Sequence, residues 1–350
     1  MRHYDPSRAD ARLLPGACAE GARKHQGECV GAYMADASST MDIRARIEAI
    51  AEDNTSGATA LAARACDVLC AAAHDAAASG TGIEGVWEVG ESLLAAQPAM
   101  VSIVNAVNAA LTAAENAPEL HMATAVRSRL DRLKRALQER PAAIADSAWR
   151  LLPERAVVMT HSFSSVVLRW LVEAHRRGHC AEAYCTESRP MCEGVALASR
   201  LTAEGVCVTL IADAAAAECV ARVDAVTIGA DGITPQGLVN KIGTYPLALA
   251  ARRARVPVYV LCGSEKILGA GCIQPRLDDL DDPAELLPEP IPGVRVRNTY
   301  FELTPLSCVS AVLTESGAVA PSDLAALFQA VPVHHRLRAH RQPPSVGREP

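Results

Sequence analysis

The sequence has few aromatic residues, no long apolar run and no excess of positive charge. Only 3% of its 350 residues are Phe, Trp or Tyr, and the formal net charge is −6. Both features argue against a protein that binds nucleic acid directly, because such proteins need cations for the phosphates and rings for base stacking. Charged residues or His interrupt every apolar run before the roughly 20 residues that a membrane helix needs, so no membrane association is predicted.

Motifs for common cofactors and metals are also missing from the sequence. No strand-like segment is followed by GxGxxG, which argues against a dinucleotide cofactor. The 12 cysteines include no CxxC pair, and their irregular spacing fits neither a zinc site nor a compact disulfide framework. No cofactor and no metal are therefore predicted. The N-terminal residues lack the apolar segment of a secretory signal, so we expect a cytoplasmic protein with free, mostly buried thiols.

Hydrophobic residues make up 50% of the chain, which is enough for a substantial core. Residues 1–37 show neither helical nor strand periodicity and are expected to form a disordered extension. The basic residues 331–350 are expected to form a disordered tail. Residues 38–150 have helical periodicity throughout and are expected to form a helical N-terminal domain.

From Arg155 the pattern changes to short strand-like segments, most of them followed by a polar turn and a helix-like segment. The segments are RAVVMTH, CAEAYCTES, GVCVTLIA, VDAVTIGA and VPVYVLC. Their alternation with helices predicts an α/β fold, in which a Rossmann-like domain with a mainly parallel sheet occupies residues 151–330. Ligands of such sheets bind beyond the carboxyl ends of the strands. Polar residues follow those ends at Thr160-His161-Ser162, Thr186-Glu187-Ser188-Arg189, Asp213 and Gly229-Ala230-Asp231.

Two short motifs have the composition of anion-binding sites. NTSGAT, residues 54–59, places hydroxyl groups and a glycine at a predicted helix start. Its backbone N–H groups can bind an anion, or its side chains can cap the helix. Arg189 follows a strand within TESRP, where its guanidinium can bind a phosphate or lie on the surface.

The segment GADGITPQGLVNKIGTYPLALAARR combines a carboxylate, an amide and an ammonium with a helix start. Asp231 follows an apolar strand, so it can act as an acid or base in a cleft, or cap the turn before Gly232. Lys241, next to Asn240, can bind a phosphate or stabilise a developing oxyanion. Gly243 allows a close approach of the backbone, and the helix that follows offers N–H groups to an anion.

This segment, extended through GSEK, resembles the signature of a superfamily. The superfamily joins methylthioribose-1-phosphate isomerases, ribose-1,5-bisphosphate isomerases and the alpha, beta and delta subunits of eukaryotic initiation factor 2B. MTHSFSSVVLRWL, CTESRPMCEGVALASRL, QPAMVSIVNAVNAAL and YFELTP resemble further segments, so the resemblance covers residues 41–330. It implies a helical domain on a Rossmann-like domain, a homodimer or higher homo-oligomer, and a pocket for a phosphorylated sugar or nucleotide.

In the isomerases of this family an aldose 1-phosphate becomes a ketose 1-phosphate without metal or nicotinamide. A Cys and an Asp act as the acid/base pair, and Asp231 matches the Asp. The resemblance assigns substrate binding to Ser56, Gly57, Ala58, Gln97, Arg189, Asn240 and Lys241.

Three positions depart from the isomerase pattern. Ser162 replaces the catalytic Cys of the THC motif, and a serine hydroxyl titrates far above the pH range in which acid/base catalysis works. Ser56 and Gln97 replace two arginines, which removes two cations from a phosphate site. His161 or Cys185 could take over the role of the missing thiol.

The sequence therefore leaves two functions open. The first is an isomerase of a phosphorylated pentose, with Asp231 and Ser162 as its catalytic residues. The second is a non-catalytic regulatory subunit like those of initiation factor 2B, or a sensor of a sugar phosphate or nucleotide.

Overall fold

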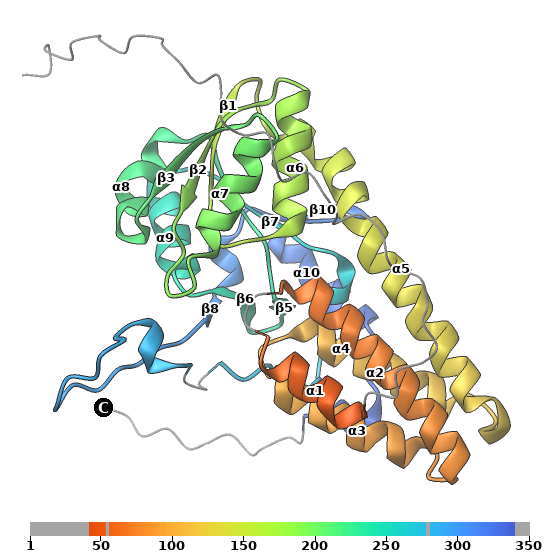
Figure 1. Cartoon of the computed structure of the whole chain (residues 1–350). Coiled ribbons are helices and arrows are strands. Elements are labelled where there is room, and N and C mark those ends of the chain that lie inside the picture. The colour runs from red at the N-terminus through yellow and green to blue at the C-terminus, as the bar shows by residue number, and fades with distance from the viewer. Residues whose placement is uncertain (1–41, 54–55, 278–280, 340–350) are drawn as a thin grey trace, which may run out of the picture. The chain divides into compact units, whose positions relative to one another are not determined.

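The computed structural model describes residues 42–53, 56–277 and 281–339. The extension expected at residues 1–37 lies outside this part. The first described elements form a helical region, which ends in a long helix that reaches the sheet (Figure 1). Its helices are α1 (Ile43–Ala51), α2 (Ala58–Ser79), α3 (Ile83–Ala96), α4 (Val101–Glu115) and α5 (Met122–Ala148).

The ends of the first two helices follow from local sequence. Asp42 caps α1, because its side chain accepts a hydrogen bond from the Arg44 N–H at 3.2 Å. Helix α2 ends at Gly80, whose φ of 73° is in the left-handed region that favours glycine. Its N-cap is Gly57, which has no side chain, so no capping bond to the first N–H groups of α2 comes from this position.

A seven-stranded sheet follows, with the order β10-β9-β7-β4-β1-β2-β3 within the described residues. All neighbouring strands are parallel except β10, which pairs antiparallel with β9. The five predicted strand segments form β1, β2, β3, β4 and β7, so the predicted fold class is confirmed. The strands are β1 (Ala156–Thr160), β2 (Cys180–Thr186), β3 (Cys207–Ile211), β4 (Ala225–Ile228), β7 (Val258–Leu261), β9 (Ala311–Thr314) and β10 (Gly317–Val319).

A smaller antiparallel sheet was not predicted from the sequence. It consists of β5 (Gly232–Thr234), β6 (Gly237–Lys241) and β8 (Phe301–Thr304). The two β-strands that follow Asp231 are short and contain glycine, and their partner β8 lies about 60 residues further along the chain. Local pattern is therefore a weak guide to them.

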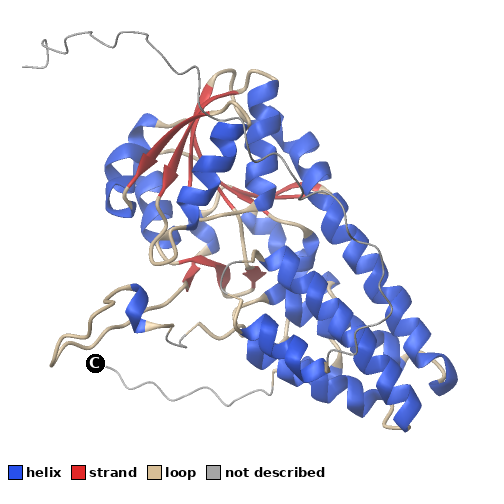
Figure 2. Ribbon diagram, in the orientation of Figure 1, coloured by secondary structure: helices blue, strands red, loops and turns tan. Residues whose placement is uncertain are grey.

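Helices cover both faces of the large sheet (Figure 2). Helices α6 (Ser165–Arg176) and α7 (Glu193–Ala203) bury one face together with the end of α5. The other face packs against α8 (Ala216–Cys219), α9 (Thr244–Ala254) and α10 (Leu324–Ala330). The sheet is thus the middle layer of an α/β sandwich, and its strand ends are left to carry polar residues.

The first part of the predicted disordered tail is ordered instead, so that prediction is wrong for residues 331–339. Leu337 is completely buried and packs into the core of the helical region. Asn108 of α4 donates from Nδ2 to the Pro332 carbonyl and accepts from the His334 N–H, both at 2.8 Å. The apolar side chains in this segment override its basic composition, which suggested disorder. Residues 340–350 lie outside the described part.

None of the helices in the described part of the chain is both long enough and apolar enough to cross a membrane.

Candidate functional site

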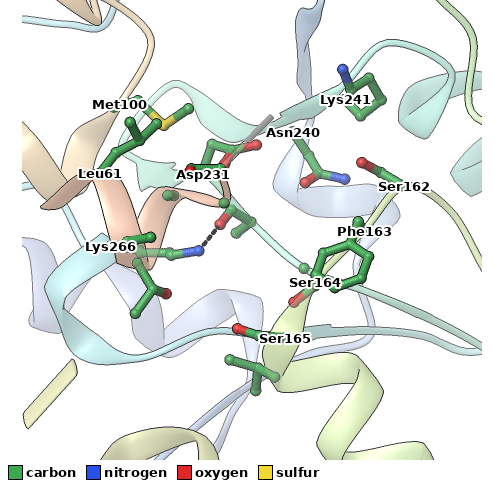
Figure 3. A pocket seen from close by; sticks show the side chains of 18 of the residues that line it. Leu61, Met100, Ser162, Phe163, Ser164, Ser165, Asp231, Asn240, Lys241 and Lys266 are labelled. Atoms are coloured by element: carbon green, nitrogen blue, oxygen red, sulfur yellow. Dashed lines mark hydrogen bonds between the residues drawn. The ribbon is translucent and has the colours of Figure 1, made fainter. Parts of the chain in front are cut away.

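A pocket of about 440 Å³ lies where the start of α2 meets the carboxyl ends of the strands (Figure 3). Its polar lining comes from α2, the β1–α6 loop, the end of β4, the end of β6 and the segment after β7. Eight of the nine predicted site residues line it: Ser56, Gly57, Ala58, Gln97, Ser162, Asp231, Asn240 and Lys241. Segments far apart in the sequence therefore meet at one place.

Arg189 is the predicted site residue that does not line the pocket. It is exposed, and its guanidinium donates to the Glu285 carbonyl at 2.9 Å. Its backbone N–H donates to Asp213 Oδ2 at 2.7 Å. Arg189 follows the end of β2, as predicted, but its side chain points away from the pocket toward Glu285. The structure therefore does not support a phosphate contact by Arg189.

Ser162 lies in the loop after β1 and lines the pocket. Its φ of 66° places it in the left-handed region, which is uncommon for a residue other than glycine. The Ser162 N–H donates to Ser188 Oγ at 2.7 Å, which anchors this conformation. Its hydroxyl forms no hydrogen bond with any residue of the described ranges, so no base activates it there.

His161 cannot activate Ser162, because both of its ring nitrogens have other partners. Nε2 lies 2.8 Å from the Ile242 carbonyl and must donate to it, which leaves Nδ1 to accept from Thr186 Oγ1 at 2.7 Å. Burial lowers the pKa of His161, only partly opposed by the bond to Ile242 and by Asp213. A neutral, fully bonded imidazole is a structural clamp between β1, β2 and the loop after β6.

Cys185 cannot replace the missing thiol either. Its side chain is completely buried in the core between the sheet and helices α6 and α7. Burial raises the pKa of this thiol to about 12. The bonds of His161 and the burial of Cys185 therefore exclude both replacements considered from the sequence.

Asp231 follows β4 and is half-buried at the centre of the pocket (Figure 3). Its N–H donates to the Val239 carbonyl at 2.9 Å, which fixes the backbone against β6. Its carboxylate accepts no hydrogen bond from the turn that follows, at least among the described residues, so the turn-cap interpretation is not supported. Burial raises the pKa of Asp231, and the nearby Lys266 and Lys241 only partly oppose this.

Lys241 is at the end of β6 and is almost completely buried. Its Nζ lies 2.5 Å from Glu193 Oε1 and 4.7 Å from the centre of the Tyr300 ring. Its neighbour Asn240 donates from Nδ2 to Thr244 Oγ1 at 2.9 Å. Both predicted residues face the pocket, but Lys241 already has an anionic partner.

The start of α9 is not available to a ligand, contrary to the expectation from the sequence. Glu302 of β8 accepts hydrogen bonds at Oε1 from the N–H groups of Gly243 and Tyr245, both at 2.8 Å. Burial raises the pKa of Glu302, although these N–H groups favour its charged form. The side chain of another strand thus takes the place that the sequence suggested for an anion.

The start of α2 is open, in contrast. Gly57 and Ala58 line the pocket, and α2 has no side-chain cap. Asp53 Oδ1 accepts from the Ser56 N–H at 2.8 Å, and its carboxylate also pairs with Arg64. Gln97 donates from Nε2 to the Ile50 carbonyl at 2.8 Å. The interpretation of NTSGAT as an anion site therefore keeps its structural basis, because no described side chain caps the start of α2, which lines the pocket.

Several pocket residues were missed from the sequence. Lys266 follows β7, and its Nζ donates to the Ala230 carbonyl at 2.5 Å, beside Asp231. Its position just after a strand of the parallel sheet could have identified it as a site residue, because ligands bind at that edge. Ser164 caps α6, and Ser165 begins it. Glu193, at the start of α7, gave no signal of its own.

The chain matches the family model described as "Initiation factor 2 subunit family" over residues 54–321. It is 34% identical to "Ribose 1,5-bisphosphate isomerase" of Archaeoglobus fulgidus over 235 residues, which are 66% of this chain and 75% of the relative. It is 31% identical to "Methylthioribose-1-phosphate isomerase" of Desulforamulus reducens, with 78% of this chain and 86% of the relative covered. The crystal structure of the translation initiation factor eIF-2B of Pyrococcus horikoshii OT3 superposes with a TM-score of 0.69 at 28% identity, covering 80% of this chain and 97% of that one.

Proposed function

Because the chain belongs to the initiation factor 2 subunit family, we propose that it binds a phosphorylated pentose and isomerises it from an aldose to a ketose 1-phosphate. The observation that carries this proposal is Asp231, a carboxyl group in the pocket whose pKa is raised by burial. A carboxyl group with a pKa moved toward neutrality can both release and accept a proton during one catalytic cycle. The isomerases among the relatives give the reaction class.

The proposed role of Asp231 is to carry the proton between the two carbons. The sugar ring opens when the bond between C1 and the ring oxygen breaks and that oxygen takes up a proton, while C2 loses its proton and an enol phosphate forms. Protonation at C1 and loss of the proton on O2 then give the ketose, so one correctly placed group can move the proton from C2 to C1. Lys266 and Lys241 lie near enough to lower the pKa of Asp231 and would stabilise negative charge on the intermediate. Asn240, at the end of β6, would bind a sugar hydroxyl.

The proposed phosphate site is the start of α2, with Ser56, Gly57 and Ala58, and the start of α6. Gln97 lines the same pocket and contributes an uncharged side chain. The positive ends of the two helix dipoles favour a phosphate, and so do the N–H groups at the start of α2, which no described side chain caps. We expect the reaction to need neither a metal nor a nicotinamide, and the protein to act in the cytoplasm as a homodimer or larger homo-oligomer.

A second candidate function is supported by Ser162. Its hydroxyl has no activating base in the described structure, and neither His161 nor Cys185 replaces the thiol. A protein with this pocket and no second acid/base group would bind the ligand without converting it. It would then act as a sensor or regulatory subunit, and the relatives include proteins named as translation initiation factor eIF-2B.

Phosphorus NMR of purified protein with pentose 1-phosphates and 1,5-bisphosphates separates the two candidates. For an isomerase, the ketose phosphate signal grows with the wild type, and Asp231→Asn abolishes this growth while ligand binding persists. Glu204→Gln, which removes an equal charge from an exposed position, is the matched control and should keep its activity. Binding without conversion by the wild type would support the sensor, and the absence of binding would overturn both.

A further inference from the structure

The two lysines of the pocket differ in their electrostatic environment. Lys241 Nζ forms an ion pair with Glu193 Oε1 at 2.5 Å, and only 4% of its side chain is exposed. Lys266 Nζ donates to the Ala230 carbonyl and has no carboxylate within ion-pair distance in the described ranges. The two lysines lie on different sides of Asp231 in Figure 3. Within the described ranges, Lys266 is therefore the pocket lysine without an ion-pair partner.

Glu193 gives the Lys241 side of the pocket a chemical preference. Glu193 lines the pocket, its side chain is 23% exposed, and its Oε2 is buried and has no hydrogen-bond partner in the described structure. A carboxylate accepts hydrogen bonds and cannot donate them, so a ligand group that lies beside it has to be a donor. A sugar hydroxyl supplies a donor, whereas an ionised phosphate supplies only acceptors and repels the carboxylate.

The charges along the rest of the lining agree with this preference. No arginine is present among the described residues that line the pocket. Of the other two acids of the lining, Asp53 is paired with Arg64, and Asp231 lies near Lys266. A ligand with two phosphates would thus meet one lysine without an ion-pair partner and the starts of α2 and α6, and the lysine near the second phosphate, Lys241, is already paired with Glu193.

We propose that Glu193 is a specificity-determining residue that restricts the pocket to a ligand with a single phosphate. The phosphate lies toward the starts of α2 and α6, and a hydroxyl group faces Glu193 and Lys241. This inference rests on the proposed function, since it names the substrate class of the same site. It distinguishes this chain from relatives that bear the name of a bisphosphate isomerase.

Titration calorimetry with ribose 1-phosphate and ribose 1,5-bisphosphate at fixed ionic strength tests the proposal. The wild type should bind the monophosphate about tenfold or more tightly than the bisphosphate. Glu193→Gln keeps the shape of the side chain, frees Lys241 and adds a donor, so the ratio should move about tenfold toward the bisphosphate. Glu204→Gln on the same helix–turn segment should leave the ratio unchanged.

The outcomes separate this inference from the function on which it rests. If the wild type binds the bisphosphate as tightly as the monophosphate, the restriction to one phosphate is wrong and the proposed function stands. An unchanged ratio in a folded Glu193→Gln variant would show that another residue sets any preference. If Glu193→Gln does not fold, the ratio of the two affinities in the wild type still decides whether the pocket is restricted to one phosphate. If neither ligand binds to the wild type, the proposed function fails, and this inference fails with it.

Discussion

The imidazole of His161 occupies the space that a side chain at Gly243 would need. A Cβ atom at Gly243 would lie 3.0 Å from both His161 Cε1 and Nε2, and the φ of Gly243 is 101°. The ring is held there by its bonds to Thr186 and to the Ile242 carbonyl. Glycine at 243 therefore serves the packing of His161, whereas the sequence suggested the approach of a ligand.

Gly243→Ala should consequently destabilise the protein. The substitution strains a backbone conformation that favours glycine and also pushes His161 from its bonds, which together should cost about 2–4 kcal/mol of unfolding free energy. Gly80→Ala is the matched control, because Gly80 has a φ of 73° and no atom within 4 Å of the added Cβ. Urea denaturation should give a clearly larger loss for Gly243→Ala, and equal losses would contradict the role of His161.

Asp231→Asn should stabilise the protein at neutral pH while it removes activity. The folded state raises the pKa of Asp231, so between the ordinary and the raised pKa the folded protein binds more protons than the unfolded chain. Its free energy of unfolding therefore falls as pH rises through this window. The asparagine variant lacks this loss, so its melting temperature should exceed that of the wild type by more at pH 8 than at pH 4. If the difference in melting temperature did not depend on pH, the pKa of Asp231 would not be raised in the folded protein.

Ser162→Cys should increase the rate of isomerisation. A thiol titrates much closer to neutral pH than a hydroxyl, and general acid/base catalysis depends on that match, so kcat should rise about tenfold or more. Ser165→Cys places a thiol at another position of the same pocket and should give no such gain. No increase in the Ser162→Cys protein, with ligand binding intact, would favour the sensor.

Arg189→Ala should leave ligand affinity within about threefold of the wild type. Its guanidinium bonds to the Glu285 carbonyl and does not line the pocket. Lys266→Gln removes the unneutralised ammonium and should weaken binding of ribose 1-phosphate about tenfold or more. Calorimetry on both variants measures this difference in affinity. A large loss of affinity in Arg189→Ala would show that Arg189 does contact the ligand.

The sequence predicted those parts of the molecule that depend on local pattern. Short Val-rich segments that alternate with helical ones determine the parallel sheet, because strand and helix periodicities differ and crossovers have one hand. Ligands bind at the carboxyl ends of such strands, so the sequence predicted that Ser162 and Asp231 lie at one site, and both line the pocket. The segment that follows Asp231 added Asn240 and Lys241, and the family resemblance added Gln97, all of which also line it.

The tertiary structure decided which way the side chains point and which partner each one takes. Arg189 turns to Glu285, Glu302 fills the start of α9, and Glu193 neutralises Lys241. The partners in these contacts lie about 50 to 100 residues apart in the sequence, and neighbouring residues give no information about such pairs. Apolar side chains of residues 331–339 pack into a core whose residues lie mostly more than 200 positions earlier in the sequence, although the local composition indicated disorder. Composition and periodicity thus determined the fold, and long-range packing determined the chemistry of the pocket.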